Sequence, residues 1–146
     1  MEPWEVAARE AVRHTIALYT YYNDRGKFDD AAACFAPDGV LEVIGIGGTR
    51  LVGRDAIRAF FSGVGASGVE PPPGRMQHHV ANVWIDVESP AAARAAAYFT
   101  VMTGAGVDHW GRYRDTFVPV EDRWLFAHRL VHTDGVTPGG WAAMRR

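Results

Sequence analysis

The second half of the chain alternates strand-like runs with short turns, and this pattern constrains the fold more than any other feature. The runs are rich in β-branched and aromatic residues, and Gly, Pro, Asp or Glu occupy the turns between them. Turns this short join antiparallel neighbours, because parallel strands need a crossover of a dozen or more residues. We therefore expect an antiparallel meander from residues 77–87, 94–104, 109–120 and 123–132. Only the alanines at 91–93 also permit a helix.

The first half is typical of helices. Residues 4–22 carry apolar side chains at helical spacing, which predicts one long amphipathic helix ending before Gly26. A short helix should follow from Asp29 or Asp30 through "AAACFA", then short strands at 40–45 and 51–53 and a third helix over 54–64. Helices followed by a long meander form an α+β pattern. A curved sheet wrapped around these helices makes a cone whose open end suits a small apolar ligand.

Composition limits the possible functions. The 146 residues, 48% of them hydrophobic, suit one domain, which we place at 1–135 with a loosely held tail at 136–146. A net charge of -2 argues against nucleic acid, and a single cysteine excludes an internal disulfide framework. No run of about 18 apolar residues suggests a membrane span, and the first residues lack the apolar core of a signal peptide. We expect a soluble cytoplasmic protein, with the Gly- and Pro-rich loop 65–75 as a candidate lid.

Two adjacent histidines open the first strand of the meander. Strand neighbours point to opposite faces, so His78 and His79 cannot have the same function. The face of His78 continues through Val80, Asn82 and Trp84, whereas the face of His79 is uniformly apolar from Ala81 to Val87. Hydrophobicity alone would turn the second face toward the core. A β-bulge near residue 80 would invert that answer, so alternation does not choose between the two histidines.

Acid–base chemistry is the remaining function for these histidines. His128 and His132 lie about 13 Å apart along a strand at roughly 3.3 Å per residue, and the sequence has no HExxH or CxxC motif, so we expect no metal and no cofactor. A catalytic His78 needs a carboxylate to fix its tautomer, and Asp24 at the end of the first helix is a candidate. Tyr19 and Tyr22, one helical turn apart, could polarise a substrate carbonyl.

Several short motifs together resemble a known family. They are "Y-x-x-x-x-D" at 19–24, "F-A-P-D-G" at 35–39, "L-V-G-R-D-A-I" at 51–57, "Q-H-x-x-x-N" at 77–82, "G-x-Y-x-D" at 111–115 and "R-W-x-x-x-x-R" at 123–129. In this order the chain resembles the SnoaL-like, scytalone dehydratase-like branch of the NTF2-like superfamily. The resemblance implies an NTF2-like (cystatin-like) cone. It also implies a catalytic Asp24–His78 dyad assisted by Tyr19, with His78 inside and His79 outside.

The resemblance further suggests which residues touch a substrate. We expect contacts from Tyr22, Asn82, Trp84, Tyr98, His109 and Arg129. For Arg129, an ion pair with Asp115 is the competing and favoured explanation, and for Trp84 it is packing. The apolar residues Ala81, Val83, Ile85 and Val87 would then cover the outer face and need a partner. This patch predicts a homo-oligomer, and the resemblance favours a trimer over a dimer.

These expectations converge on one enzymatic function. The protein would be a cofactor-independent lyase that performs a dehydratase-type elimination on a small hydrophobic, aromatic or polyketide-like substrate. A polyketide cyclase or an isomerase could use the same dyad, because proton abstraction is common to all three reactions. From another class, the chain could be a non-catalytic ligand-binding module or the small subunit of a ring-hydroxylating oxygenase.

Overall fold

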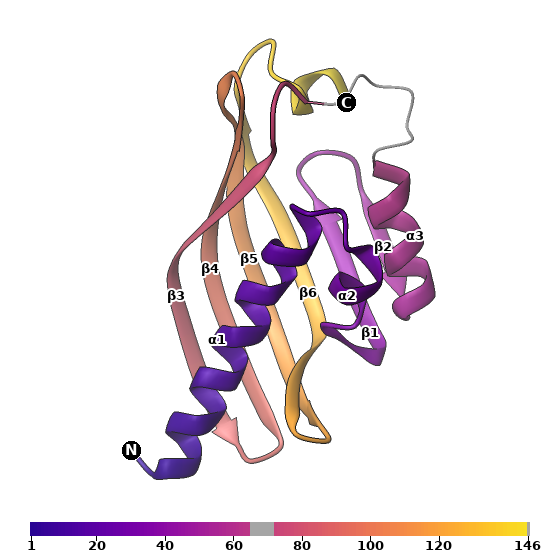
Figure 1. The fold of residues 1–146 in the computed structure, drawn as a ribbon. Coiled ribbons are helices and arrows are strands. Elements are labelled where there is room, and N and C mark those ends of the chain that lie inside the picture. Colours follow the sequence, from indigo (N-terminus) through magenta and orange to yellow (C-terminus); the bar gives the residue numbers. More distant parts are fainter. Residues whose placement is uncertain (65–71, 146) are drawn as a thin grey trace.

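A computed structural model describes residues 1–64 and 72–145. The described part has three α-helices, one six-stranded sheet and a C-terminal turn of 3-10 helix (Figure 1). The helices are α1 (Pro3–Asn23), α2 (Phe28–Ala32) and α3 (Arg54–Val64), and the C-terminal turn is η1 (Ala142–Arg145). The strands are β1 (Phe35–Ile44), β2 (Thr49–Val52), β3 (Gln77–Ser89), β4 (Ala92–Thr103), β5 (Gly106–Val120) and β6 (Arg123–Val136).

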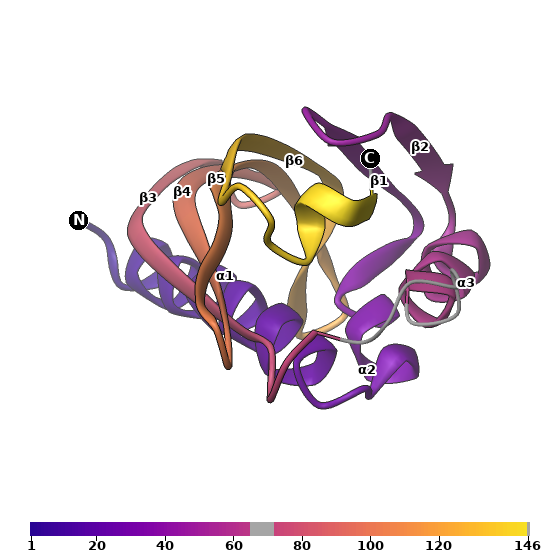
Figure 2. The ribbon, with the colours of Figure 1, turned by 90° about the horizontal axis from the view of Figure 1, so that it is seen from above.

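The sheet is a curved and unclosed layer with the order β2-β1-β6-β5-β4-β3. Its last four strands form the antiparallel meander expected from the sequence, and β1 joins β6 in parallel. Figure 2 shows the sheet curving around α1, with α2 and α3 beside β1. The α+β class and the cystatin-like cone are therefore confirmed. None of the described helices is long and apolar enough to cross a membrane.

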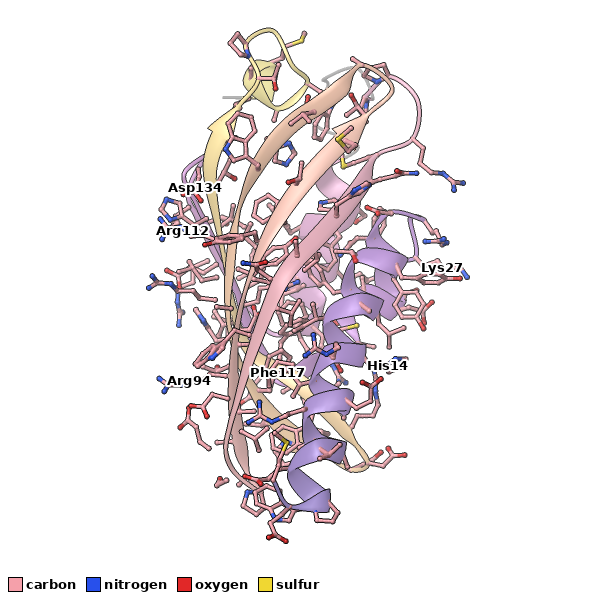
Figure 3. The ribbon with its side chains drawn as sticks, turned by 90° about the vertical axis from the view of Figure 1, so that its left-hand side faces the viewer. His14, Lys27, Arg94, Arg112, Phe117 and Asp134 are labelled. Carbon is pink, nitrogen blue, oxygen red and sulfur yellow. The ribbon has the colours of Figure 1, made fainter. Side chains whose placement is uncertain are left out.

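Helix α1 lies across the concave face of the sheet. Its buried residues Ala8, Val12, Ile16 and Tyr19 follow the predicted spacing. Thr15 Oγ1 also donates to the carbonyl oxygen of Trp124, at 2.5 Å. Figure 3 shows α1 beside the sheet, with Arg94 and Arg112 projecting from the outer face. The positive φ of Gly26 ends the helix where the sequence predicts, which leaves Asp24 at the end of α1.

The second helix is shorter than predicted, because its expected C-terminal half belongs to β1. α2 ends at Ala32, and β1 begins at Phe35, opposite Phe126 of β6. The Phe126 N–H donates to the Cys34 carbonyl oxygen at 2.9 Å, which draws this segment to the sheet. Cys34 is fully buried, and burial raises the pKa of its thiol to about 11. The alanines that permitted a helix lie in β4 from Ala92 onward.

A β-bulge in β3 reverses which side chains face the core. Ala81 pairs with Tyr98 and Trp84 with Ala96, so two residues of β3 oppose one residue of β4. Asn82 supplies the turn with a φ of 53°, a left-handed conformation that asparagine tolerates better than most residues. Even-numbered residues therefore face inward before the bulge, and odd-numbered residues face inward after it.

The bulge corrects the predicted outer face. Ile85 and Val87 are buried in the core, only 5% and 7% exposed, so they do not cover the outer face as expected. Trp84, predicted for the pocket, is 53% exposed on the outer face instead. The apolar patch invoked for a homo-oligomer is thus wrong in composition. A dimer or trimer stays a prediction drawn from the resemblance.

The register of β3 can be tested by two neighbouring substitutions. Ile85→Ala should lower the free energy of unfolding by about 2–5 kcal/mol, because it removes a large side chain from a packed core. Trp84→Ala should change it by about 0.5 kcal/mol or less, as is usual for exposed positions. Urea unfolding followed by circular dichroism gives both values. The opposite ranking would mean that β3 has no bulge.

Candidate active site

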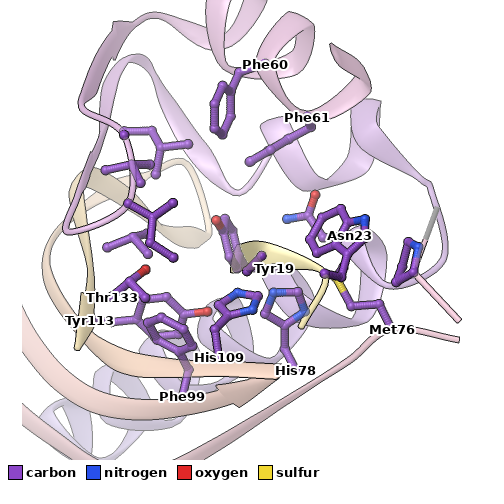
Figure 4. A pocket seen from close by; sticks show the side chains of 18 of the residues that line it. Tyr19, Asn23, Phe60, Phe61, Met76, His78, Phe99, His109, Tyr113 and Thr133 are labelled. Atoms are coloured by element: carbon purple, nitrogen blue, oxygen red, sulfur yellow. The ribbon is translucent and has the colours of Figure 1, made fainter. Parts of the chain in front are cut away.

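A cavity of about 450 Å³ lies between the concave face of the sheet, the C-terminal end of α1 and the helix α3 (Figure 4). Most of its wall is apolar. The apolar lining residues are Phe28, Leu41, Val43, Ile46, Phe60, Phe61, Pro72, Met76, Phe99, Val131, Trp141 and Ala142. The polar lining residues are Tyr19, Asn23, His78, His109, Tyr113 and Thr133. Histidine is thus the only ionisable basic residue in the described part of the wall.

Among the described residues, Asp24 and His78 form the first of two carboxylate–histidine pairs whose histidine lines this cavity. His78 Nδ1 lies 2.5 Å from Asp24 Oδ1, and the His78 main-chain N–H donates to Asp24 Oδ2 at 2.9 Å. The helix end and the start of β3 are therefore joined through both carboxylate oxygens. The side chains are 13% and 20% exposed for Asp24 and His78, so the contact is largely shielded from water. Because Nδ1 faces the carboxylate, Nε2 is the ring nitrogen left for the cavity.

The neighbouring histidine lies outside the cavity. His79 is exposed on the outer face, and its Nε2 lies 3.4 Å from Gln77 Oε1. The structure therefore brings together the pair that the sequence suggested, and separates His79 from it. The catalytic role of that pair is a separate question, which the geometry alone leaves as a prediction.

Asp108 and His109 form a second pair on the same cavity wall, at the far side of β4. His78 pairs with Val101 of β4, and Val101 pairs with His109 of β5, so the two histidines lie two strands apart in register. Figure 4 shows both rings pointing into the cavity. His109 Nδ1 lies 2.8 Å from Asp108 Oδ2, and Asp108 is only 2% exposed.

The role of Asp108 was missed in the sequence because simple alternation puts neighbours on opposite faces. His109 pairs with Val101, whereas Val107 pairs with Met102, so the register shifts at Asp108. This irregularity lets a buried carboxylate sit directly behind the next residue. The adjacent letters Asp-His were the only available signal, and they are uninformative in a regular strand.

Two buried tyrosines line the cavity above a buried ion pair. The Arg129 guanidinium makes two hydrogen bonds to Asp115, at 2.8 and 3.1 Å, and both side chains are fully buried. Its carbon Cζ lies 4.3 Å from the ring centroid of Tyr19 and 3.6 Å from that of Tyr113. Arg129 is thus a structural cation beneath the pocket, which favours the ion-pair explanation over substrate contact.

Burial keeps both phenols protonated. Loss of water contact raises the pKa of Tyr19 to about 12, although the charge of Arg129 opposes the shift. Burial also raises the pKa of Tyr113. These hydroxyls are therefore hydrogen-bond donors at neutral pH. The sequence motif around Tyr113 was visible, but nothing in it indicated that the side chain lines a cavity.

Three of the predicted substrate contacts are wrong in position. Asn82 and Trp84 are exposed because the bulge turns them outward. Tyr98 is 57% exposed, since it alternates with the inward residues Ala97 and Phe99 of β4. Tyr22 packs against the core but does not line the cavity. Of the predicted contacts, His109 is the one that the structure places in the wall.

The C-terminal segment is part of the site and not a loose tail. The main-chain N–H groups of Trp141 and Ala142 donate to Asp108 Oδ1 and Oδ2, at 2.6 and 3.1 Å. Both residues line the cavity. Figure 2 shows this segment above the opening of the cone. Most of the predicted lid at 65–75 lies outside the described residues.

Within residues 1–64 and 72–145, no group of three or more His, Cys, Asp or Glu side chains is placed to hold a metal ion. The expectation of a cofactor-free site stays a prediction that needs a measurement.

A comparison with known protein families agrees with the order of the motifs and with the cone-shaped fold. The SnoaL-like domain matches residues 4–130. The chain belongs to the SnoaL-like domain family. A comparison with curated protein sequences gave no significant match.

Solved structures share this SnoaL-like fold. A scytalone dehydratase-like protein from Novosphingobium aromaticivorans has a TM-score of 0.77 and 24% identity, covering 94% of this chain and 91% of that chain. A protein from Catenulispora acidiphila, in complex with S-DNPA, has a TM-score of 0.73 and 28% identity, covering 88% and 95%. The beta subunit assigned to an aromatic-ring-hydroxylating dioxygenase of N. aromaticivorans has a TM-score of 0.74 and 15% identity, covering 93% and 94%.

The raised phenol pKa predicts a specific alkaline instability. The pKa of Tyr19 is about 12 in the folded protein and near 10 when unfolded, so its contribution to stability is complete below pH 10 and is lost as the pH rises toward 12. Between pH 9 and 11.5, wild type should lose about 2 kcal/mol more unfolding free energy than Tyr19→Phe. Urea unfolding at both pH values measures this difference. Equal losses would show that Tyr19 ionises in the folded protein as it does in water.

Proposed function

We propose that this SnoaL-like protein is a cofactor-independent lyase that eliminates a leaving group from a small neutral carbonyl compound. The observation that carries the proposal is the 2.5 Å contact between Asp24 Oδ1 and His78 Nδ1 at the edge of an apolar cavity. A carboxylate in that position holds the neutral ring with its Nδ1 protonated. It thereby leaves the Nε2 lone pair as a general base.

His78 Nε2 takes a proton from the carbon next to the substrate carbonyl. The electrons of the broken C–H bond form the new C=C bond, and the bond to the leaving group breaks with its electron pair. The imidazolium that forms is stabilised by Asp24, and the apolar surroundings strengthen this attraction. After the step, His78 returns its proton to water and the dyad is restored.

Groups that can donate a hydrogen bond or a proton to the carbonyl oxygen and to the leaving group line the same cavity. Tyr19 and Tyr113 keep their phenol protons at neutral pH, so either can donate a hydrogen bond to the carbonyl oxygen as charge develops there. When His109 carries a second proton on Nε2, it can give that proton to a departing hydroxide, which leaves as water, and the ring then regains a proton from solvent. In that case the products are an unsaturated carbonyl compound and one water molecule.

The wall supports a substrate class more than a single substrate. Its described part contains no Lys, Arg, Asp or Glu, which favours a neutral molecule. Its volume of about 450 Å³ lies in the usual range for small-molecule sites, and Phe28, Phe60 and Phe61 offer flat apolar surfaces. The related C. acidiphila protein holds S-DNPA, which supports a small-molecule role for this fold. We infer a flat cyclic carbonyl compound with a leaving group one carbon from the acidic C–H.

Other functions make less use of the observed residues. Cyclisation or isomerisation would begin with the same proton abstraction, so the dyad is neutral between them and elimination. The dioxygenase beta subunit shares only the fold at 15% identity. A structural subunit has no need of two histidines backed by carboxylates in one cavity, and this arrangement favours an enzyme over a subunit or a passive binding module.

Replacing the base and its carboxylate should abolish most of the activity. His78→Ala should lower kcat/KM by about 10²–10⁴-fold, because it removes general-base catalysis. Asp24→Asn should have a comparable effect, since the amide neither fixes the tautomer nor stabilises the imidazolium. The assay follows the absorbance of the conjugated product from a panel of neutral cyclic β-hydroxy ketones.

His79→Ala is the matched control, because it removes an imidazole one residue away on the opposite face. It should retain activity within about threefold, as expected for a residue that does not touch the substrate. Circular dichroism establishes that each variant is folded. Normal turnover by a folded His78→Ala would eliminate the proposal.

Removal of metal should leave the activity unchanged. The protein would be treated with a chelator, its metal content measured, and its kcat compared with that of the untreated protein. Because every proton transfer above is assigned to a side chain, no loss is expected. A bound metal in one-to-one ratio whose removal stops turnover, and whose return restores it, would contradict the cofactor-free mechanism.

A further inference from the structure

Asp108 has an unusual set of partners for a buried carboxylate. Oδ1 accepts from the Trp141 main-chain N–H at 2.6 Å, and Oδ2 accepts from the Ala142 main-chain N–H at 3.1 Å. Oδ2 also lies 2.8 Å from His109 Nδ1. One carboxylate therefore joins the C-terminal segment, which we define as residues 137–145, to a ring that points into the cavity.

Burial makes these partners depend on one another. A carboxylate that is 2% exposed is stable only when its oxygens are hydrogen-bonded. Hydrogen bonds to a charged acceptor are stronger than neutral ones, so each main-chain donor contributes to keeping Asp108 charged and in place. If the C-terminal segment leaves, the carboxylate loses two donors and gains access to water. His109 then loses the fixed acceptor for its Nδ1.

The same segment also forms part of the cavity wall. The Thr137 N–H donates to the Asp108 carbonyl oxygen at 2.8 Å, which starts the segment beside β5. The segment then turns so that Trp141 and Ala142 line the cavity wall. The segment thus contributes to the wall and also donates to the carboxylate that contacts His109.

We propose that Asp108 is a positioning residue that makes the orientation and tautomer of His109 dependent on docking of the C-terminal segment. In the docked state Asp108 holds a proton on His109 Nδ1, so Nε2 carries a proton only when the ring is positively charged. Without the docked segment, Asp108 no longer selects one orientation and one tautomer of the His109 ring. The proposal rests on the proposed function only in the role given to His109.

The test reads the His109 ring without any substrate. In ¹⁵N-labelled protein at a pH where the ring is neutral, long-range ¹H–¹⁵N spectra distinguish the protonated nitrogen from the unprotonated one. A His109→Gln variant supplies the assignment. Wild type should show Nδ1 protonated. Asp108→Asn should move both ring nitrogens toward exchange-averaged values, because the neutral amide no longer selects one tautomer, while the His78 ring signals stay unchanged.

A second variant disturbs the segment and leaves the carboxylate intact. A Cβ at Gly140 would lie 2.9 Å from Asp108 Oδ1 and 2.9 Å from the Thr137 carbonyl oxygen, so Gly140→Ala must displace the segment. Hydrogen exchange at the Trp141 and Ala142 amides should become about 10-fold faster, the effect expected for one lost hydrogen bond. The His109 ring nitrogens should shift in the same direction as in Asp108→Asn. Gly63→Ala is the matched control, because a Cβ there meets no atom of the described residues within 4 Å.

The outcomes separate this proposal from the function above. Shifted His109 signals in both variants, with His78 signals and the Gly63→Ala control unchanged, would support the coupling. His109 signals that stay as in wild type in either variant would overturn it. Neither the ring-nitrogen spectra nor the amide hydrogen exchange depends on enzymatic turnover. A failure here therefore leaves the His78 substitutions as the test of the lyase, and an inactive substrate panel leaves this test intact.

Discussion

The extra residue in β3 is the constraint on which the rest of the site depends. Without it, a strand that buries Ile85 and Val87 would turn His79 inward and His78 to solvent. With it, the part of β3 after Asn82 packs on α1, and the part before Asn82 places His78 at the end of the same helix. The left-handed backbone of Asn82 is the local cost of satisfying both requirements. One strand thus supplies both core side chains and the candidate catalytic His78.

The carboxylates and the guanidinium of the described site lie behind the side chains that line the cavity. Its carboxylates stand behind histidines, and its guanidinium stands behind aromatic rings and an aspartate. Burial lowers the pKa of Arg129, but Asp115, Tyr113 and Tyr19 together raise it above the ordinary value, so the cation persists. The wall itself therefore offers imidazole, phenol, amide and hydroxyl groups within an apolar lining. Such a wall is consistent with the neutral substrate and the proton transfers proposed above.

Much of this arrangement was predictable from the sequence, and most of the failures share a cause. Helical spacing predicted α1, turn residues predicted the meander, and the resemblance to the SnoaL-like family implied the pairing of Asp24 with His78. Tyr98 lies in a regular part of β4 and alternates away from the cavity, whereas Asn82 and Trp84 were misplaced because strict alternation was continued through a bulge. Asp108 was missed for the same reason, at a second register shift. Irregularities of this kind depend on pairing with a distant strand, and the local sequence does not encode them clearly.

The prediction of a loosely held C-terminal tail was wrong for a different reason. Its glycines and proline are typical of a tail, and nothing nearby in sequence indicates a partner. The partner is a carboxylate roughly thirty residues earlier, whose need for hydrogen bonds appears only after β5 and β6 have paired. The buried carboxylate of Asp108 thus holds in place a segment, residues 137–145, whose own composition does not predict an ordered structure.

The shared fold explains why similarity alone leaves the activity open. A dehydratase-like protein and a dioxygenase beta subunit both superpose on the chain with TM-scores above 0.7. The cone is a scaffold with a cavity at its wide end, and it supports different functions according to the side chains that reach that cavity. In this chain, two strands separated by β4 each bring one histidine there, and each histidine has a carboxylate at its Nδ1. In the proposed mechanism His78 is the base and His109 the acid, and their places on one wall let them act on two atoms of one small molecule, as elimination requires.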